Sequence, residues 1–162
     1  MKTKENLMAG FSGESQANRK YTAFADVAEK EGHKDIARLF RATAEAENVH
    51  ALAELKQAGK LNDTAENLKA AIEGETYEFT EMYPDFEKTA IAEGEKQAIR
   101  IFQLAKEAEK VHAKLYQEAL DNIGKETGVA YFLCPVCGYI EKVSAPEACP
   151  ICQAKGSVFK KY

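Results

Sequence analysis

Two copies of one motif, Glu-x-x-His, constrain this chain more than any other feature of its sequence: Glu47–His50 and Glu109–His112. On a helix, each motif places a carboxylate and an imidazole on one face, because residues three apart are neighbours there. A Gly-Glu pair that ends in Glu14 or Glu75 precedes each motif by 33 or 34 residues. Two such motifs and two further glutamates form the ligand set of a carboxylate-bridged dimetal site in a four-helix bundle. The sequence therefore predicts such a bundle around such a site.

The two motifs belong to a longer internal repeat. Residues 62 positions apart are identical at many places. The identical pairs are Tyr21 and Tyr83, Phe24 and Phe86, Gly32 and Gly94, Arg38 and Arg100, Phe40 and Phe102, Glu47 and Glu109, Val49 and Val111, and His50 and His112. A repeat of this length indicates two helical hairpins of the same design.

The first 123 residues or so read as four helices. They are rich in alanine, glutamate, lysine and leucine, and Pro84 is their only proline. Glycines stand where these helices would end: Gly32, Gly59, Gly94 and Gly124. From the apolar spacing we predict helices over about 4–31, 34–58, 64–92 and 95–123. The composition then changes, which predicts a helical domain over 1–126 and a small β-rich module over 127–162.

The repeat has one defect. Its Gly-Glu pairs lie 61 residues apart, whereas the identical positions lie 62 apart, so the third helix carries one extra residue. An extra residue absorbed inside a helix forms a π-bulge, and such bulges concentrate at functional sites. We therefore predict a distortion between Thr76 and Pro84. It could turn Glu78 inward as an additional carboxylate, where the first hairpin has Ala17, so that one metal exchanges ligands with redox state.

A lone Glu-x-x-His is more often a surface pattern of a charged helix than a metal site. Two copies in register, each with a Gly-Glu pair at matching distance, argue against the surface interpretation. Tyr21 and Tyr83 stand two helical turns from Glu14 and Glu75. The sequence leaves two roles open for these tyrosines: plain packing, or a phenol that donates to a ligating carboxylate.

All four cysteines lie in two Cys-Pro-x-Cys knuckles, Cys134–Cys137 and Cys149–Cys152. Four thiolates accept zinc or a single iron, and the spacing does not choose between them. Beside a redox-capable dimetal site iron is favoured, because iron in four sulfurs passes one electron and zinc does not. Cysteines confined to one module also indicate metal ligation in a reducing compartment rather than disulfides.

Charge and hydropathy exclude several functions. The formal net charge is −4 and the pI is near 5.5, which argues against binding to nucleic acid or to an anionic membrane. No apolar run approaches the roughly 20 residues of a membrane span. The first residues lead into an amphipathic stretch rather than a secretory signal. We expect a cytoplasmic protein.

The chain resembles the rubrerythrin family over essentially its whole length. The residues that carry the resemblance are Gly13–Ala17, Glu47–His50, Gly74–Pro84, Glu109–His112 and the two Cys-Pro-x-Cys knuckles. The resemblance implies a ferritin-like diiron bundle followed by a rubredoxin-like domain. It assigns the two irons to Glu14, Glu47, His50, Glu75, Glu78, Glu109 and His112, and one further iron to Cys134, Cys137, Cys149 and Cys152.

The resemblance also implies an activity: a non-haem peroxidase that reduces hydrogen peroxide to water in oxidative-stress defence. Electrons would enter through the rubredoxin-type iron from a rubredoxin or an NAD(P)H-dependent reductase. Glu75, Glu78 and His50 would be the catalytic residues, because the family associates His50 and Glu75 with movement of one iron between redox states. Zinc or manganese could substitute for iron in either site.

The connection between the second and third helices, about residues 59–63, is short for the predicted bundle. Five to eight extended residues span at most roughly 17–29 Å, and the return path along the bundle is of order 30 Å. We therefore predict a homodimer, with domain swapping as one way to form it: the first hairpin of one chain would complete a site with the second hairpin of the other. By the resemblance, the cysteine module would lie nearer to a partner's dimetal site than to its own.

Two other classes of protein would use some of the same ligand residues. A ferroxidase or iron-handling ferritin-like protein would need the same bundle ligands but gives no reason for the cysteine module. A zinc-ribbon interaction protein built on an inert bundle gives no reason for the doubled Glu-x-x-His motif.

Overall fold

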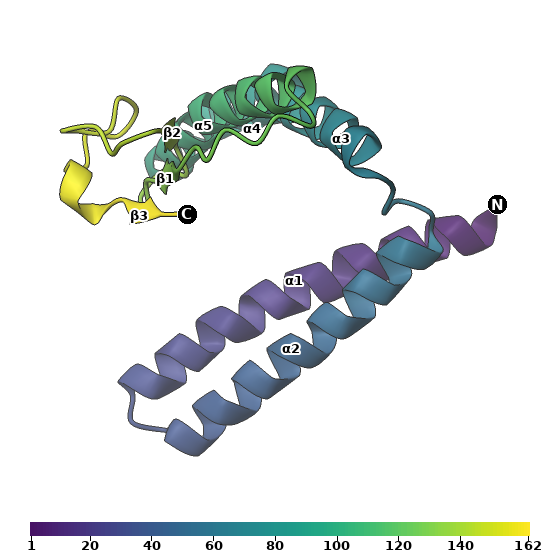
Figure 1. Cartoon of the computed structure of the whole chain (residues 1–162). Coiled ribbons are helices and arrows are strands. Elements are labelled where there is room, and N and C mark those ends of the chain that lie inside the picture. The colour runs from purple at the N-terminus through teal and green to yellow at the C-terminus, as the bar shows by residue number, and fades with distance from the viewer. The chain divides into compact units, whose positions relative to one another are not determined.

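The computed structural model describes all 162 residues (Figure 1). Its helices are α1 (Lys2–Lys30), α2 (Lys34–Gln57), α3 (Thr64–Tyr77), α4 (Tyr83–Glu93) and α5 (Lys96–Asp121), with a π-helical segment, η1 (Glu78–Met82), between α3 and α4. The strands β1 (Tyr131–Leu133), β2 (Ile140–Lys142) and β3 (Lys160–Lys161), and a short 3-10 helix, η2 (Gly156–Val158), follow. The predicted class, mainly α with a small β module, is confirmed.

The predicted helix limits agree with the observed ones to within two residues, once α3, η1 and α4 are taken as one interrupted helix. Two compact units make up the chain, Met1–Asn62 and Asp63–Tyr162. None of the helices combines the length and the apolar character that crossing a membrane requires.

The first unit is a hairpin of α1 and α2 whose seam consists of small side chains. Its buried residues are alanines, such as Ala25 and Ala37 at 0% exposure, together with Asn18. The Asn18 amide donates a hydrogen bond of 2.7 Å to the carbonyl of Ala44 across the seam. Larger apolar side chains stay outside it: Leu39 and Val49 are each 65% exposed. The hairpin by itself therefore buries no large side chain and leaves apolar surface uncovered.

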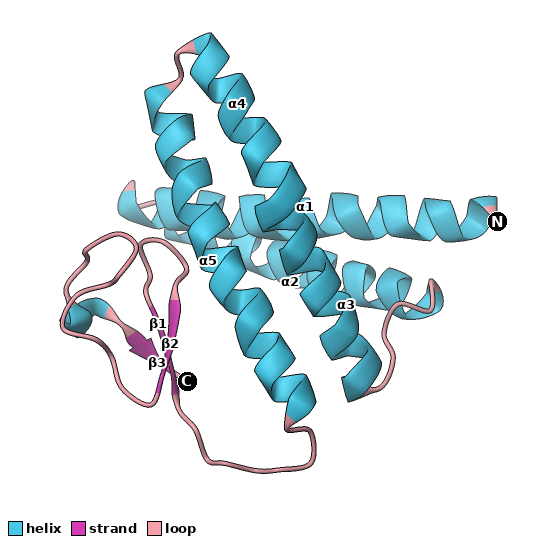
Figure 2. Ribbon diagram, turned by 90° about the horizontal axis from the view of Figure 1, so that it is seen from above, coloured by secondary structure: helices cyan, strands magenta, loops and turns pink.

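The second unit begins at a capped helix. Asp63 accepts a hydrogen bond of 2.9 Å from the backbone N–H of Glu66, which satisfies one free donor at the start of α3. The interrupted helix then runs beside α5, which packs against both α3 and α4 (Figure 2). The predicted distortion between Thr76 and Pro84 is confirmed, because η1 lies inside that range.

The module that ends the second unit is a three-stranded antiparallel sheet in the order β2-β1-β3. Phe132 at its centre is paired with Glu141 on one side and with Lys161 on the other. The sheet is too small to enclose a core of its own. The buried cluster of the module consists instead of Cys134, Tyr139 and Cys149, so the cysteine site is also the module's core.

Candidate metal centres

The first unit brings three of the predicted ligands together. Glu14 from α1 and Glu47 and His50 from α2 have donor atoms that all lie within 4.8 Å of one another. His50 Nδ1 is 3.1 Å from Glu47 Oε2 and 3.9 Å from Glu14 Oε1. A hydrogen bond with Glu47 raises the pKa of Glu14, since two carboxylates this close share a proton more readily than they bear two charges. A divalent cation would relieve the same repulsion.

The second unit repeats this arrangement with Glu75 from α3 and Glu109 and His112 from α5. His112 Nδ1 is 2.6 Å from Glu109 Oε2 and 3.7 Å from Glu75 Oε2. Burial, followed by the charge of Glu109, raises the pKa of Glu75 to about 7. The hydrogen bond with Glu109 raises the pKa of His112. The His112 side chain is 17% exposed against 59% for His50, so the second cluster is the more enclosed of the two.

Glu78 is the first residue of η1. Burial raises the pKa of Glu78, and so does the charge of Glu109, because the Glu78 carboxyl lies close enough to the second cluster to interact with it. It is not one of the three residues whose donor atoms lie within 4.8 Å. Ala17 at the matching place in α1 offers no such group, so the two halves differ here as the sequence predicts.

Tyr21 and Tyr83 occupy equivalent aromatic trios. Tyr21 packs with Phe24 and Phe40, and Tyr83 with Phe86 and Phe102, at the same ring separations of 6.2, 6.2 and 5.6 Å. Burial and the charges of Glu109, Glu78 and Glu75 raise the pKa of Tyr83. Packing is therefore observed for both tyrosines. A phenol that donates to a ligating carboxylate stays a prediction, with Tyr83 the nearer candidate.

The four cysteines form the third cluster. The Sγ atoms of Cys134 and Cys152 are 3.6 Å apart and those of Cys137 and Cys149 are 3.5 Å apart, and all four thiols are free. Sulfur atoms bound tetrahedrally at about 2.3 Å would lie roughly 3.8 Å from one another. Burial would raise the pKa of Cys134, but hydrogen bonds from the backbone N–H groups of Val136 and Cys137 and from neighbouring thiols lower it, whereas burial raises the pKa of Cys137 and of Cys152. The separations of the four sulfur atoms therefore fit one tetrahedral metal ion bound by all four thiolates.

The hydrogen bond that Nε2 of His112 makes supports the interpretation of the second cluster as a metal site. His112 Nε2–H donates to the carbonyl of Gly138, 2.8 Å away in the cysteine module. This fixes the ring tautomer and leaves Nδ1, which faces the two glutamates, free to bind a cation, as metal-binding histidines usually are. One imidazole and two carboxylates in each half also suit iron.

Sequence reasoning missed this contact, because its acceptor is a backbone carbonyl that no side-chain pattern marks. The contact places the module beside the second cluster of its own chain, whereas the expectation that it lies nearer to a partner's complete dimetal site stays a prediction. A second residue that the sequence reasoning missed is Glu54, one turn beyond His50 on α2. Its buried Oε2 has no hydrogen-bond partner, and its charge contributes to the raised pKa of Glu14 after the larger effect of Glu47.

Comparison with known families gives two adjacent matches. Residues 5–120 match the family model described as Rubrerythrin. The chain belongs to the rubrerythrin family. Residues 132–160 match the model described as Rubrerythrin, rubredoxin-like domain. The rubrerythrin match covers both carboxylate–histidine clusters, and the rubredoxin-like match covers all four cysteines.

Individual rubrerythrins align along nearly the whole chain. Nigerythrin from Nitratidesulfovibrio vulgaris is 40% identical, over 99% of this chain and 86% of that protein. Rubrerythrin from Porphyromonas gingivalis is 37% identical, over 98% of this chain and 89% of that protein. A solved structure of nigerythrin in a mixed-valence state matches with a TM-score of 0.62, at 40% identity and over 99% of this chain and 86% of that one. Family membership indicates an oxidoreductase whose clusters are consistent with iron.

Proposed function

We propose that this rubrerythrin is a non-haem diiron peroxidase that reduces hydrogen peroxide to water. The observation that carries the proposal is the pair of matching clusters, each with one imidazole and two carboxylates, together with a four-thiolate module in hydrogen-bond contact with one of them. A dimetal site would carry out the reduction of peroxide, and a one-electron centre beside it would deliver the electrons. We propose domains over 1–126 and 127–162.

We further propose that the site is completed in a homodimer by domain swapping. The first unit leaves Leu39 and Val49 exposed, which is apolar surface that a four-helix bundle would bury. Six residues, 58–63, separate α2 from α3. Extended, they span at most roughly 20 Å. That is short of a helix-length return, so the first hairpin of one chain would pair with the second hairpin of its partner.

Two ferrous ions in the assembled site would supply two electrons together, which breaks the O–O bond without releasing a hydroxyl radical. The balance is one hydrogen peroxide, two electrons and two protons in, and two water molecules out. The chain's own residues hold the cations: Glu14, Glu47 and His50 from one unit, and Glu75, Glu109 and His112 from the other. Glu78 stands beside this set as a carboxyl that can hold a proton or take a place as ligand. We propose Glu75, Glu78 and His50 as the catalytic residues.

The two histidines would have different roles. The Gly138 carbonyl holds His112 at Nε2, so its Nδ1 stays directed at Glu109 and at the cation position. His50 contacts carboxylates at Nδ1, but the structure gives it no partner at Nε2, and its side chain is 59% exposed. A ligand held on one side only is the one that can let a cation move, so we assign any redox-linked movement to the His50 side of the site.

Electrons would come from a rubredoxin or an NAD(P)H-dependent reductase and pass through the four-cysteine module. Four free thiols suit a reducing compartment, which supports a cytoplasmic location. The donor sets also accept zinc or manganese, so metal loading depends on supply. A ferroxidase or iron-handling role is the alternative, and the module's contact with His112 gives no advantage to an iron store.

A spectrum and an assay test the proposal. The oxidised protein should be red from iron in four thiolates, whereas zinc there would leave that module colourless. The chemically reduced protein should consume hydrogen peroxide, with one water-forming turnover per pair of electrons. Glu75→Ala and His112→Ala should abolish consumption, while Glu73→Ala and His33→Ala, exposed residues of the same types, should not. Unchanged turnover in both ligand variants would refute the site.

A further inference from the structure

Glu54 is a glutamate of α2 that lies one helical turn beyond His50. Residues four apart share a helix face, so Glu54 follows His50 on the face that carries the first cluster. Helical side chains lean toward the N-terminus of their helix, which in α2 directs Glu54 back toward His50. Gly10 stands one turn before Glu14 on α1 in the same way. Gly10 and Glu54 therefore lie at the level of the hairpin next to the first cluster.

The carboxyl group of Glu54 fills the place of a missing side chain on α1. A Cβ at Gly10 would lie 2.7 Å from the Cδ of Glu54 and 2.8 Å from its Oε2, and closer still to its Oε1. These distances are too short for a real Cβ, so the carboxyl group can take this position only because residue 10 is glycine. Glycine inside a helix costs roughly 1 kcal/mol relative to alanine. The first hairpin thus has a helix-weakening residue where it admits the head of Glu54.

In this position the carboxyl group has no partner of its own. Oε2 of Glu54 is buried and accepts no hydrogen bond. No lysine or arginine forms an ion pair with Glu54, and Glu14 and Glu47 have only His50 as a basic neighbour. An unsatisfied buried acceptor costs roughly 1–3 kcal/mol, and more when it is charged. A cation beside Glu54 would remove that cost.

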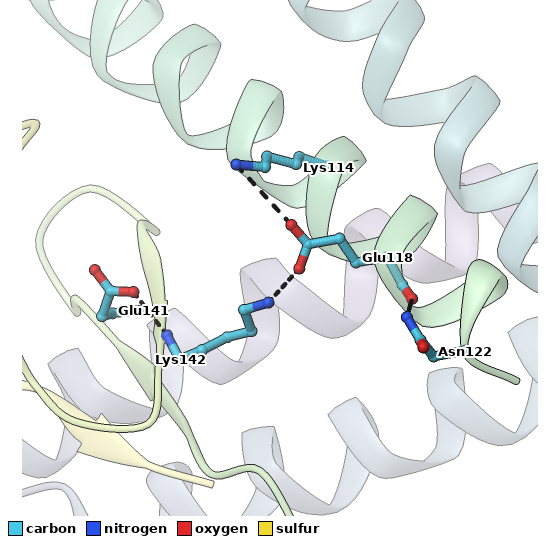
Figure 3. Close-up of polar contacts among 5 residues, drawn as sticks. All are labelled: Lys114, Glu118, Asn122, Glu141 and Lys142. Atoms are coloured by element: carbon cyan, nitrogen blue, oxygen red, sulfur yellow. Dashed lines mark hydrogen bonds and ion pairs between the residues drawn. The ribbon is translucent and has the colours of Figure 1, made fainter. Parts of the chain in front are cut away.

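Other partly exposed carboxylates of the chain do have partners. Glu118 of α5 has the ammonium of Lys142 at one oxygen and that of Lys114 3.9 Å from the other (Figure 3). Glu141 accepts a hydrogen bond of 2.9 Å from the backbone N–H of Lys142. These carboxylates are satisfied by donors of the protein itself, whereas Glu54 is left for a partner that the chain does not supply.

The internal repeat shows that this arrangement belongs to one half only. The second hairpin has Tyr116 four residues after its histidine, and it has Ala71 where the first hairpin has Gly10. It offers no carboxylate at this level, but it has Glu78, which the first hairpin lacks. Each half therefore has one carboxylate beyond its compact cluster, and the two come from different positions of the repeat.

The charge of Glu54 reaches the first cluster. It contributes to the raised pKa of Glu14, after the larger effect of the hydrogen bond with Glu47. Glu54 is not one of the three residues of this cluster whose donor atoms lie within 4.8 Å of one another, just as Glu78 is not one of the three in the second cluster. Its place beside the cluster is therefore that of an additional ligand rather than a permanent one.

We propose that Glu54, with its carboxyl group against Gly10, is an additional carboxylate ligand for a divalent cation at the first cluster. It would do for the His50 side of the dimetal site what Glu78 would do for the other side. Cation binding by Glu54 stands by itself. Its use in a redox-linked movement of that cation rests on the proposed function.

Titration with cobalt(II) tests the proposal without turnover. The full-length protein is used with its cysteines filled by one equivalent of zinc, so that cobalt reports on the carboxylate–histidine site. Glu54→Gln keeps the size of the side chain and removes its charge. It should weaken one of the two cobalt-binding steps roughly tenfold, as loss of a supporting group does at metal sites. Glu45→Gln removes the same charge from an exposed position of α2 and should leave both steps unchanged.

Gly10→Ala separates a ligand from a packing contact. The new methyl group displaces the head of Glu54, which ends a flexible side chain, so the same cobalt-binding step should weaken by a similar factor. The metal-free variant should melt no lower than the wild type, because alanine favours the helix by roughly 1 kcal/mol. The double variant Gly10→Ala/Glu54→Gln should bind cobalt no more weakly than the weaker single variant, because both changes remove one interaction.

The assignment is wrong if Glu54→Gln binds cobalt as tightly as Glu45→Gln does. It is also wrong if Gly10→Ala and Glu54→Gln lower the melting temperature of the metal-free protein and leave cobalt binding intact, which is the result of a structural contact. Losses of affinity that add in the double variant would show that Glu54 does not act from its place at Gly10. If cobalt binding responds as expected while the reduced wild type consumes no peroxide, the proposed function fails and the ligand stands.

Discussion

Glu75 shows at the scale of one residue how the second cluster is prepared for a cation. Burial and the neighbouring Glu109 raise the pKa of Glu75 to about 7, from an ordinary value of 4.5. Between these two values the folded metal-free protein binds more protons than the unfolded chain. The free energy of unfolding must therefore fall as the pH rises through this interval.

Metal-free protein should accordingly melt at a lower temperature at pH 7.5 than at pH 5, whereas metal-loaded protein should not, because a bound cation replaces the proton. Thermal unfolding monitored by circular dichroism in chelator and in excess iron checks both directions. Glu75→Gln should flatten the pH dependence of the metal-free protein. A metal-free stability that rises over this interval would contradict the assignment.

Gly156 is a second residue whose role follows from its surroundings. A Cβ at this position would lie 1.9 Å from the carbonyl oxygen of Pro146, which is backbone and has no rotamer to change. Gly156→Ala should therefore destabilise the module by about 2 kcal/mol, as overpacking commonly does. Faster loss of metal from the four cysteines to a chelator measures the effect. Ser157→Ala, at the exposed next position, should not alter that rate.

At the scale of elements, η1 is where the two hairpins stop being copies. Two contacts with α5 lie on opposite sides of η1. Before η1, Glu75 lies 3.7 Å from His112 of α5, and after it, Tyr83 packs against Phe102 of α5. Deleting Thr80 should turn α3–η1–α4 into one regular helix. That rotates one side by about 100° relative to the other, so the trio and the cluster cannot both keep their contacts with α5.

The deletion variant should fold as a helical protein but bind one equivalent of iron fewer than the wild type at the dimetal site. Iron titration followed by elemental analysis measures this. Thr80→Ala, which keeps the chain length, is the control and should retain full loading. A deletion variant with full iron content and full peroxide turnover would show that η1 is dispensable.

The helix ends and the position of the π-helical segment can be predicted from the sequence. The offset of 61 against 62 locates the π-helical segment, and the glycines locate the helix ends, because both depend on local backbone geometry. The contact of the cysteine module with α5 cannot be predicted in this way. Its contacts join a backbone carbonyl at Gly138 and one lysine and one glutamate in a chain that is 30% charged. Pairing among so many similar charges is decided only by the fold.

At the scale of the whole molecule, the divided ligand set predicts how chains cooperate. Glu14 and His50 belong to the first unit, and Glu75 and His112 to the second. In a domain-swapped dimer each site takes its halves from different chains. A chain with Glu14→Ala/His50→Ala and a chain with Glu75→Ala/His112→Ala would each form homodimers without an intact site. Their heterodimer would contain one site with all its ligands and one with none of these four.

Coexpressing the two variants in equal amounts should therefore restore peroxide turnover and iron binding to about a quarter of the wild-type level, since half of the dimers are mixed and half of their sites are intact. Mixing the separately purified variants without unfolding should restore nothing, because the swapped hairpins do not exchange. If each site were built within one chain, every chain in the coexpressed sample would carry a broken half. Turnover would then stay at the level of the separate variants, and the swapped arrangement would be wrong.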